Sequence, residues 1–187
     1  MSAQFISGFL VPEIKTVRSL EAARQLSDPI YLPLVDRLRQ MRQKRGGTLV
    51  VGIAGIHRGA GATYVTGRLE KELARQTGDR VCSFAPHLIE SGSRTTRVAL
   101  ANPNELEDMT KRADYVLIDC PPVQQSGFAA VVGRHADGMF LVIEAGRTSR
   151  TEIQGALTSL SLHSVPVLGL VLNKRKYPIP KAIYRWL

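Results

Sequence analysis

The sequence predicts an α/β fold, in which a parallel, doubly wound β-sheet is flanked by helices. Three observations predict it. Short apolar runs typical of buried strands alternate with segments whose apolar residues recur at helical spacing. The strands are apolar throughout, as in the run 115–118, which is typical of a parallel sheet covered on both faces. A glycine-containing turn, 55–61, joins the first strand to the helix that follows it.

Each element is expected from a local signal. Helices are indicated by apolar residues three or four positions apart, by caps such as the capping box Ser149-Arg-Thr-Glu152, and by terminal glycines such as Gly78. Strands are indicated by short apolar runs bounded by turn residues. In the first half of the chain we expect a short helix at 16–26, a helix at 30–45, a strand at 49–54, a helix from 62 to 78 and a strand at 80–85. A loop at 86–103 follows, with an irregular strand at 98–100. In the second half we expect a helix that starts at 102–105, a strand at 115–118, a helix at 128–134, a strand at 139–143, a helix from 149 and a strand at 165–172.

The length and composition indicate one globular domain. We assign residues 30–187 to this domain and 1–29 to an N-terminal extension. Cys82 and Cys120 fall in apolar strands and are expected to be buried free thiols. The start of the chain lacks the pattern of a secretory signal, and no apolar run approaches the ~20 residues that span a bilayer. We therefore expect a cytoplasmic protein, with peripheral attachment to the inner membrane left open.

The chain is basic, with a formal net charge of +9. This charge favours contact with anions such as nucleotides, phospholipid surfaces, nucleic acid or an acidic partner, although a basic surface without a dedicated ligand is the alternative. The helix expected at 30–45 is amphipathic and could dock on a membrane or a partner. The simpler interpretation is the solvated face of an ordinary packed helix. Its basic residues are Arg37, Arg39, Arg42, Lys44 and Arg45.

The turn after the first strand has the layout of a phosphate-binding loop. It precedes a helix, so that its backbone N–H groups and the helix N-terminus can bind an anion. The expected binding residues are Gly59, Ala60, Gly61, Ala62 and Thr63. Such loops usually end in Gly-Lys-Thr or Gly-Lys-Ser, whereas this one ends in Gly61-Ala62-Thr63. The lysine that would reach the β- and γ-phosphates is therefore an alanine.

Other candidate residues follow the carboxyl ends of the strands, where ligands bind in parallel sheets. Asp119 ends an apolar strand and suits a magnesium site together with the Thr63 hydroxyl, or orientation of an attacking nucleophile; capping a turn before two prolines is the alternative. Arg58 and Arg147 are the candidates to replace the missing lysine, although each could be a plain surface arginine. We expect the loop, Asp119, the turn 144–148 and Asn173 to converge on one crevice.

The sequence resembles the tyrosine autokinase domains of bacterial capsule and exopolysaccharide systems, which are relatives of the septum-positioning and plasmid-partition ATPases. The resemblance implies a P-loop NTPase-like sheet, ATP or ADP with Mg²⁺, and a membrane polysaccharide co-polymerase as partner. It also implies that Asn173 faces the adenine, where its amide can donate and accept. The segments that carry the resemblance are 50–73, Asp114-Tyr-Val-Leu-Ile-Asp-Cys-Pro-Pro122, Ala136-Asp-Gly-Met-Phe-Leu-Val-Ile-Glu-Ala-Gly-Arg-Thr148 and Val167-Leu-Gly-Leu-Val-Leu-Asn173.

The chain departs from this family at three places. Ala62 replaces the lysine of the loop, and Val81-Cys-Ser-Phe-Ala-Pro-His87 replaces a strand that carries Asp-x-Asp in the kinases. The C-terminal stretch has Tyr177 and Tyr184 but no tyrosine cluster. Since phosphoryl transfer depends on charge stabilisation, these losses predict a degenerate member, a pseudokinase that is a regulatory or scaffold subunit. The alternatives are an active ATPase or kinase that uses Arg58 or Arg147, and a partition-type protein that binds nucleic acid non-specifically, which the dispersed basic residues disfavour. Homo-oligomerisation is left open.

Overall fold

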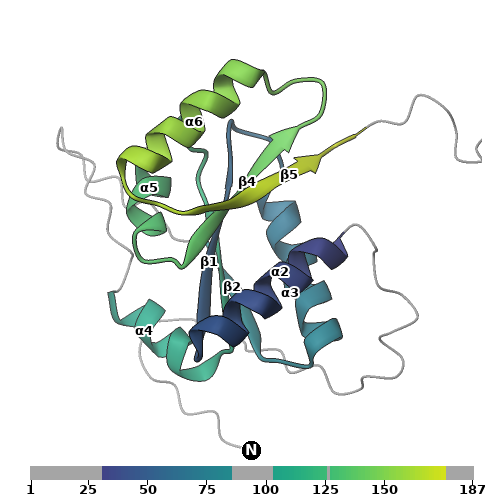
Figure 1. The fold of residues 1–187 in the computed structure, drawn as a ribbon, viewed down its shortest axis with the longest axis vertical. Helices are drawn as coiled ribbons and strands as arrows, with labels where there is room; N and C mark the ends of the chain where they lie inside the picture. The colour runs from purple at the N-terminus through teal and green to yellow at the C-terminus, as the bar shows by residue number, and fades with distance from the viewer. Residues whose placement is uncertain (1–30, 86–102, 126, 176–187) are drawn as a thin grey trace, which may run out of the picture.

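The computed structural model describes residues 31–85, 103–125 and 127–175 (Figure 1). The extension assigned to 1–29, the helix expected at 16–26 and the irregular strand expected at 98–100 lie outside these residues. The described part contains helices and strands in strict alternation after the first helix. Their bounds are α2 Leu32–Arg45, β1 Leu49–Gly55, α3 Ala62–Thr77, β2 Val81–Phe84, α4 Pro103–Arg112, β3 Tyr115–Cys120, α5 Phe128–Gly133, β4 Gly138–Glu144, α6 Arg150–Leu162 and β5 Val167–Asn173.

The five strands form one parallel sheet in the order β2-β3-β1-β4-β5. The central strand β1 is buried along its whole length. Helices α2 and α3 bury Leu38 and Leu69 against one face of the sheet, while α4, α5 and α6 bury Met109, Val132 and Leu160 against the other (Figure 1). The predicted parallel, doubly wound sheet is therefore confirmed. Both cysteines are free and buried, as expected.

Strand β5 differs from the prediction that every strand is buried. Its side chains are half-buried or exposed, and Leu170 and Leu172 are 45% and 52% exposed. The reason is its position: β5 lies at the end of the strand order, and it pairs with β4 alone. An apolar sequence identifies a strand but does not say whether a neighbour or helix covers it. In addition, β3 continues to Cys120, two residues beyond the predicted end.

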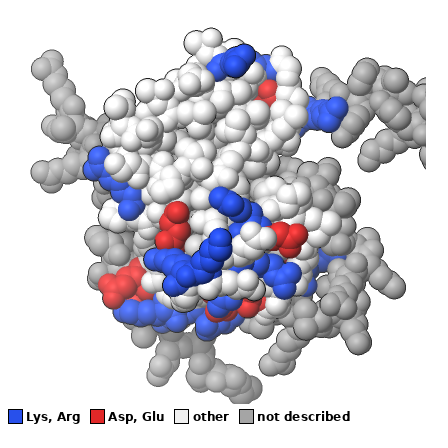
Figure 2. Space-filling view, viewed as in Figure 1, with Lys and Arg blue, Asp and Glu red and all other residues white. Residues whose placement is uncertain are grey.

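Ion pairs fix α2 to the edge of the sheet at which β1 and β3 begin. The Arg42 guanidinium lies 2.7 Å from the Asp114 carboxylate and 3.3 Å from that of Asp79, and Arg45 lies 2.6 Å from Asp137. Part of the basic helix face is thus structural, and whether its exposed residues dock on a partner or are simply solvated stays a prediction. Figure 2 shows Lys and Arg gathered with acidic residues over the half of the molecule that contains α2, whereas the half with α6 and β5 is largely uncharged.

Gly46 ends α2. It has a φ of +72°, a left-handed value that glycine adopts without strain, and its N–H bonds to the Arg42 carbonyl at 2.9 Å. The turn 46–48 then leads directly into β1. None of the helices in the described ranges has the length and hydropathy that crossing a bilayer would require.

Candidate functional site

The loop between β1 and α3 is shaped by two glycines. Gly59 and Gly61 have φ values of +81° and +97°, which side-chain-bearing residues rarely adopt. Gly61 is the N-cap of α3 and has no side chain, so no N-cap side chain accepts a hydrogen bond from the first amides of the helix. Such amides carry a partial positive charge and are satisfied by water or by an anion. The local geometry is therefore that of an anion-binding helix N-terminus.

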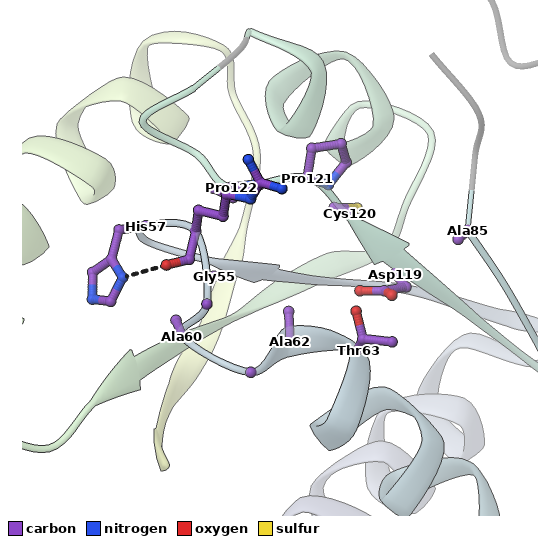
Figure 3. Close-up of a pocket in the computed structure, with 13 residues that line it drawn as sticks. Gly55, His57, Ala60, Ala62, Thr63, Ala85, Asp119, Cys120, Pro121 and Pro122 are labelled. Carbon is purple, nitrogen blue, oxygen red and sulfur yellow. Dashed lines mark hydrogen bonds between the residues drawn. The ribbon is translucent and has the colours of Figure 1, made fainter. Parts of the chain in front are cut away.

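A cavity of about 320 Å³ opens beside this loop (Figure 3). The loop forms one wall, and the ends of β3 and β2 form the opposite wall. All the loop residues that the sequence predicts, from Arg58 to Thr63, line the cavity, and so does Asp119. The remaining lining residues are Gly55, His57, Ala85, Cys120, Pro121 and Pro122.

The side chains of Asp119 and Thr63 point toward each other at the cavity, with their oxygen atoms adjacent in Figure 3. Partial burial raises the pKa of the Asp119 carboxyl, and a hydrogen bond with the Thr63 side chain opposes this by lowering it. A carboxylate and a hydroxyl are ligands that suit Mg²⁺, which also takes water and phosphate oxygens. In the described residues no group of three or more His, Cys, Asp or Glu could hold a metal ion. Among the described residues, the pair suits a magnesium ion that also takes phosphate and water oxygens as ligands.

The candidate cations occupy different places. Arg58 lines the cavity, and it is the lone Lys or Arg among the described lining residues. Arg147 does not line it; its guanidinium is 3.4 Å from the Glu144 carboxylate. The ammonium of Lys174 is 3.3 Å from the same carboxylate oxygen. Sequence reasoning did not single out Lys174 as a member of this cluster, because the pairing depends on the register of β4 and β5.

Asn173 contacts the loop without lining the cavity. Its side-chain N–H donates to the Ala60 carbonyl at 2.9 Å. The prediction that Asn173 lies near the loop agrees with this geometry, while its proposed contact with adenine stays a prediction. The turn after β4 also contacts the loop, because His57 Nε2 lies 3.0 Å from the Thr148 hydroxyl. Nothing local in the sequence signals this contact of His57.

The end of β2 contributes no carboxylate to the cavity wall. Ala85, the residue after β2, lines the cavity. Ser83 points elsewhere and donates to the Glu70 carboxylate on α3 at 2.8 Å. The polar groups at the described cavity wall are therefore the backbone of the loop, Thr63, Asp119, His57 and Arg58, with no lysine at position 62.

The sheet order, the glycine loop and the helix that follows it define an α/β fold of the P-loop NTPase type. Solved structures show the same fold. The VpsO kinase domain has a TM-score of 0.63 at 18% identity, covering 79% of this chain and 93% of that one. The kinase domain of the Escherichia coli tyrosine kinase ETK has a TM-score of 0.57 at 18% identity, covering 83% and 84%. An Archaeoglobus fulgidus nucleotide-binding protein in complex with ADP has a TM-score of 0.52 at 17% identity, covering 79% and 74%.

Sequence comparison identifies the relatives as bacterial tyrosine-protein kinases. CpsD of Streptococcus pneumoniae is 31% identical over 99 residues, which cover 50% of this chain and 44% of that protein. CpsD of Streptococcus agalactiae serotype III is 36% identical over 61 residues, covering 33% and 26%. No protein-family profile matches the chain. The chain is thus related to the bacterial tyrosine-protein kinases, and the matches span less than half the length of these relatives.

Proposed function

We propose that this protein is a degenerate relative of the bacterial tyrosine kinases that acts as a regulatory or scaffold subunit in capsule or exopolysaccharide assembly, with little or no ATP hydrolysis. One observation carries the proposal. The loop retains its backbone geometry, with left-handed Gly59 and Gly61 before α3, while the side chain that follows is the methyl group of Ala62. The shape that binds phosphate is kept, and the positioned charge that stabilises phosphoryl transfer is absent.

The retained parts support weak binding of ATP or ADP with Mg²⁺. The amides at the start of α3 would hold phosphate oxygens, and the Thr63 hydroxyl and the Asp119 carboxylate would hold the metal, directly or through water. Mg²⁺ would supply charge neutralisation of the phosphate group. Without it, the Asp119 carboxylate would face a polyanion at close range. We therefore expect nucleotide binding to depend strongly on Mg²⁺.

The missing groups argue against efficient turnover. Removing one preorganised donor from a transition state typically costs about 100- to 1,000-fold in rate. Here Ala62 stands where the kinases have lysine. Among the described residues, β2 and Ala85 also bring no carboxylate to the cavity wall, in contrast to the kinase pattern. Arg58 is exposed and enters the cavity wall from the loop itself. A single exposed arginine is a poor substitute for several fixed charges.

We propose a membrane polysaccharide co-polymerase as the partner, at the cytoplasmic face of the inner membrane. The exposed basic face of α2 is the proposed contact surface. Its residues Arg37, Arg39 and Lys44 are exposed, whereas Arg42 and Arg45 are paired with carboxylates of the sheet edge. Contact with the membrane surface and homo-oligomerisation are further proposals for the same assembly.

Calorimetric titration of the purified protein with ADP and ATP, with and without Mg²⁺, tests the binding step. The proposal predicts weak, magnesium-dependent heats that Arg58→Ala reduces. Complementation then tests the role in the cell: deletion of the gene should impair polymer export, and an Asp119→Asn allele should restore it. An Asp119→Asn allele that behaves like the deletion would refute a purely structural role.

A second candidate, an active ATPase or tyrosine kinase that uses an arginine, is favoured by one observation, which is that Arg58 lines the cavity. Arg147 is a weaker candidate because it pairs with Glu144 and lies outside the cavity wall. Steady turnover that Arg58→Ala abolishes, and that Arg147→Ala leaves unchanged, would establish this candidate.

A further inference from the structure

We infer that Asn173 and His57 are positioning residues that hold the phosphate loop from two neighbouring strand ends, so that its anion-binding shape exists before a ligand arrives. This inference rests on the proposed function in one respect, which is that the loop binds a phosphate. Its structural core, that these two contacts hold the loop, can be tested without a ligand.

The first contact comes from the end of β5. Asn173 pairs with Glu144 in the β4–β5 register, and its carbonyl accepts a hydrogen bond from Ala145 at 2.9 Å, so its backbone is fixed in the sheet. From this position its side-chain N–H reaches Ala60, 113 residues earlier in the chain, at 2.9 Å. A Cβ atom at Gly61 would overlap the same nitrogen. The Asn173 amide therefore lies directly against the loop, and glycine at position 61 leaves room for it.

The second contact comes from the turn after β4. His57 Nδ1 lies 3.1 Å from the Arg58 carbonyl, which can accept but not donate, so Nδ1 carries the proton. In the neutral ring Nε2 then accepts from the Thr148 hydroxyl at 3.0 Å. That hydroxyl oxygen in turn accepts from the Glu144 N–H at 2.9 Å. Every donor in this series of hydrogen bonds thus has an acceptor. The series ends at the backbone of β4.

These contacts restrain both halves of the loop. The Ile56 N–H pairs with the Val142 carbonyl at 3.1 Å, so the loop leaves β1 still bonded to β4, and His57 and Ala60 are held next. A loop with two left-handed glycines has many alternative conformations, and restricting it in advance lowers the ordering cost at binding. This matters here because, with Ala62 in place of lysine, affinity for an anion depends mainly on backbone N–H groups.

The test measures amide hydrogen exchange of the full chain without ligand, with segments that cover 56–63 compared with the rest of the sheet. Asn173→Ala removes the contact with Ala60, and Thr148→Val removes the hydroxyl that bonds both His57 and the Glu144 N–H. Thr148→Ser keeps the hydroxyl and is the conservative rescue, and Gln154→Ala on the exposed side of α6 is the control. We expect exchange in 56–63 to rise roughly five- to ten-fold in Asn173→Ala, as loss of one net hydrogen bond implies, and at least as much in Thr148→Val. The serine and control variants should match the wild type.

Titration with Mg²⁺-ADP is the second measurement on the same variants. Asn173→Ala and Thr148→Val should weaken binding several-fold, while Thr148→Ser should not. If the wild type binds no nucleotide, the proposed function fails, and the exchange experiment still decides whether the contacts hold the loop. Unchanged exchange in 56–63 in both Asn173→Ala and Thr148→Val would overturn the inference. If Asn173→Ala does not fold, the comparison of Thr148→Val with Thr148→Ser decides it.

Discussion

Restoring a lysine at position 62 should convert the weak anion site into a strong one. Ala62 is the first residue of α3, is half-buried and lines the cavity, so a longer side chain there has room to reach a phosphate in the about 320 Å³ of free space. A hydrogen bond to a charged group contributes about 1.5–3 kcal/mol, which corresponds to about 10- to 150-fold in affinity. Lysine is nearly as good a helix former as alanine, so the fold should tolerate it. A cation at a helix N-terminus should reduce the stability of the fold only slightly.

The assay is calorimetric titration of Ala62→Lys with Mg²⁺-ATP and Mg²⁺-ADP. Ala62→Gln is the matched control, because it has a similar length and donates hydrogen bonds but carries no charge. We expect Ala62→Lys to bind at least ten-fold more tightly than the wild type, with Ala62→Gln close to the wild type. Equal affinities of Ala62→Lys and Ala62→Gln would refute the reasoning, because they would show that no phosphate lies within reach of position 62.

Three further predictions concern stability. Burial raises the pKa of Asp119, so the folded state holds its proton more tightly than the unfolded state and stability falls as the pH rises from the ordinary value of 3.8 through the raised pKa. Asp119→Asn should therefore be more stable than the wild type in urea at neutral pH, and the difference should vanish below the ordinary pKa. Burial alone would raise the pKa of Asp114, but hydrogen bonds from Arg80 and the charge of Arg42 outweigh this effect and lower the pKa. The stability that Asp114 contributes is therefore present at neutral pH and is lost as the pH falls through its pKa in the folded state. Asp114→Asn should cost about 1–2 kcal/mol at pH 7, measured by urea denaturation, and less in acid. Leu38→Ala at the fully buried α2 position should cost about 2–5 kcal/mol in thermal or urea unfolding, whereas Leu162→Ala, at a side chain 78% exposed, should cost under about 0.5 kcal/mol.

Local signals in the sequence account for most of the fold. The strand at 49–54, the glycine loop and the helix ended by Gly78 are each specified by neighbouring residues, and the structure has all three. The capping box predicted at Ser149 is present, with reciprocal bonds between Ser149 and Glu152. The strand order was not predictable in the same way, because it depends on which strands pair across the chain. The exposure of β5 follows from that order and from its place at the sheet edge.

In the candidate site, too, some residues could be placed from the sequence and others could not. Arg58 to Thr63 and Asp119 meet at one cavity because a loop after β1 and a residue at the end of β3 share one edge of a parallel sheet. The contacts of Asn173 with Ala60 and of His57 with Thr148 join residues 113 and 91 positions apart, and side-chain geometry alone decides them. The position of Arg147 in the sequence predicts correctly that its turn lies beside the loop, but it does not predict that its guanidinium pairs with Glu144.

Steady-state release of phosphate from Mg²⁺-ATP by the purified chain tests the central claim most directly. We propose that the loop keeps its anion-binding backbone while the groups needed for phosphoryl transfer are missing. We therefore predict that the wild type and Asp119→Asn release phosphate at the same rate as buffer alone. Turnover by the wild type that Asp119→Asn abolishes would contradict it, because the cavity would then contain a working catalytic carboxylate.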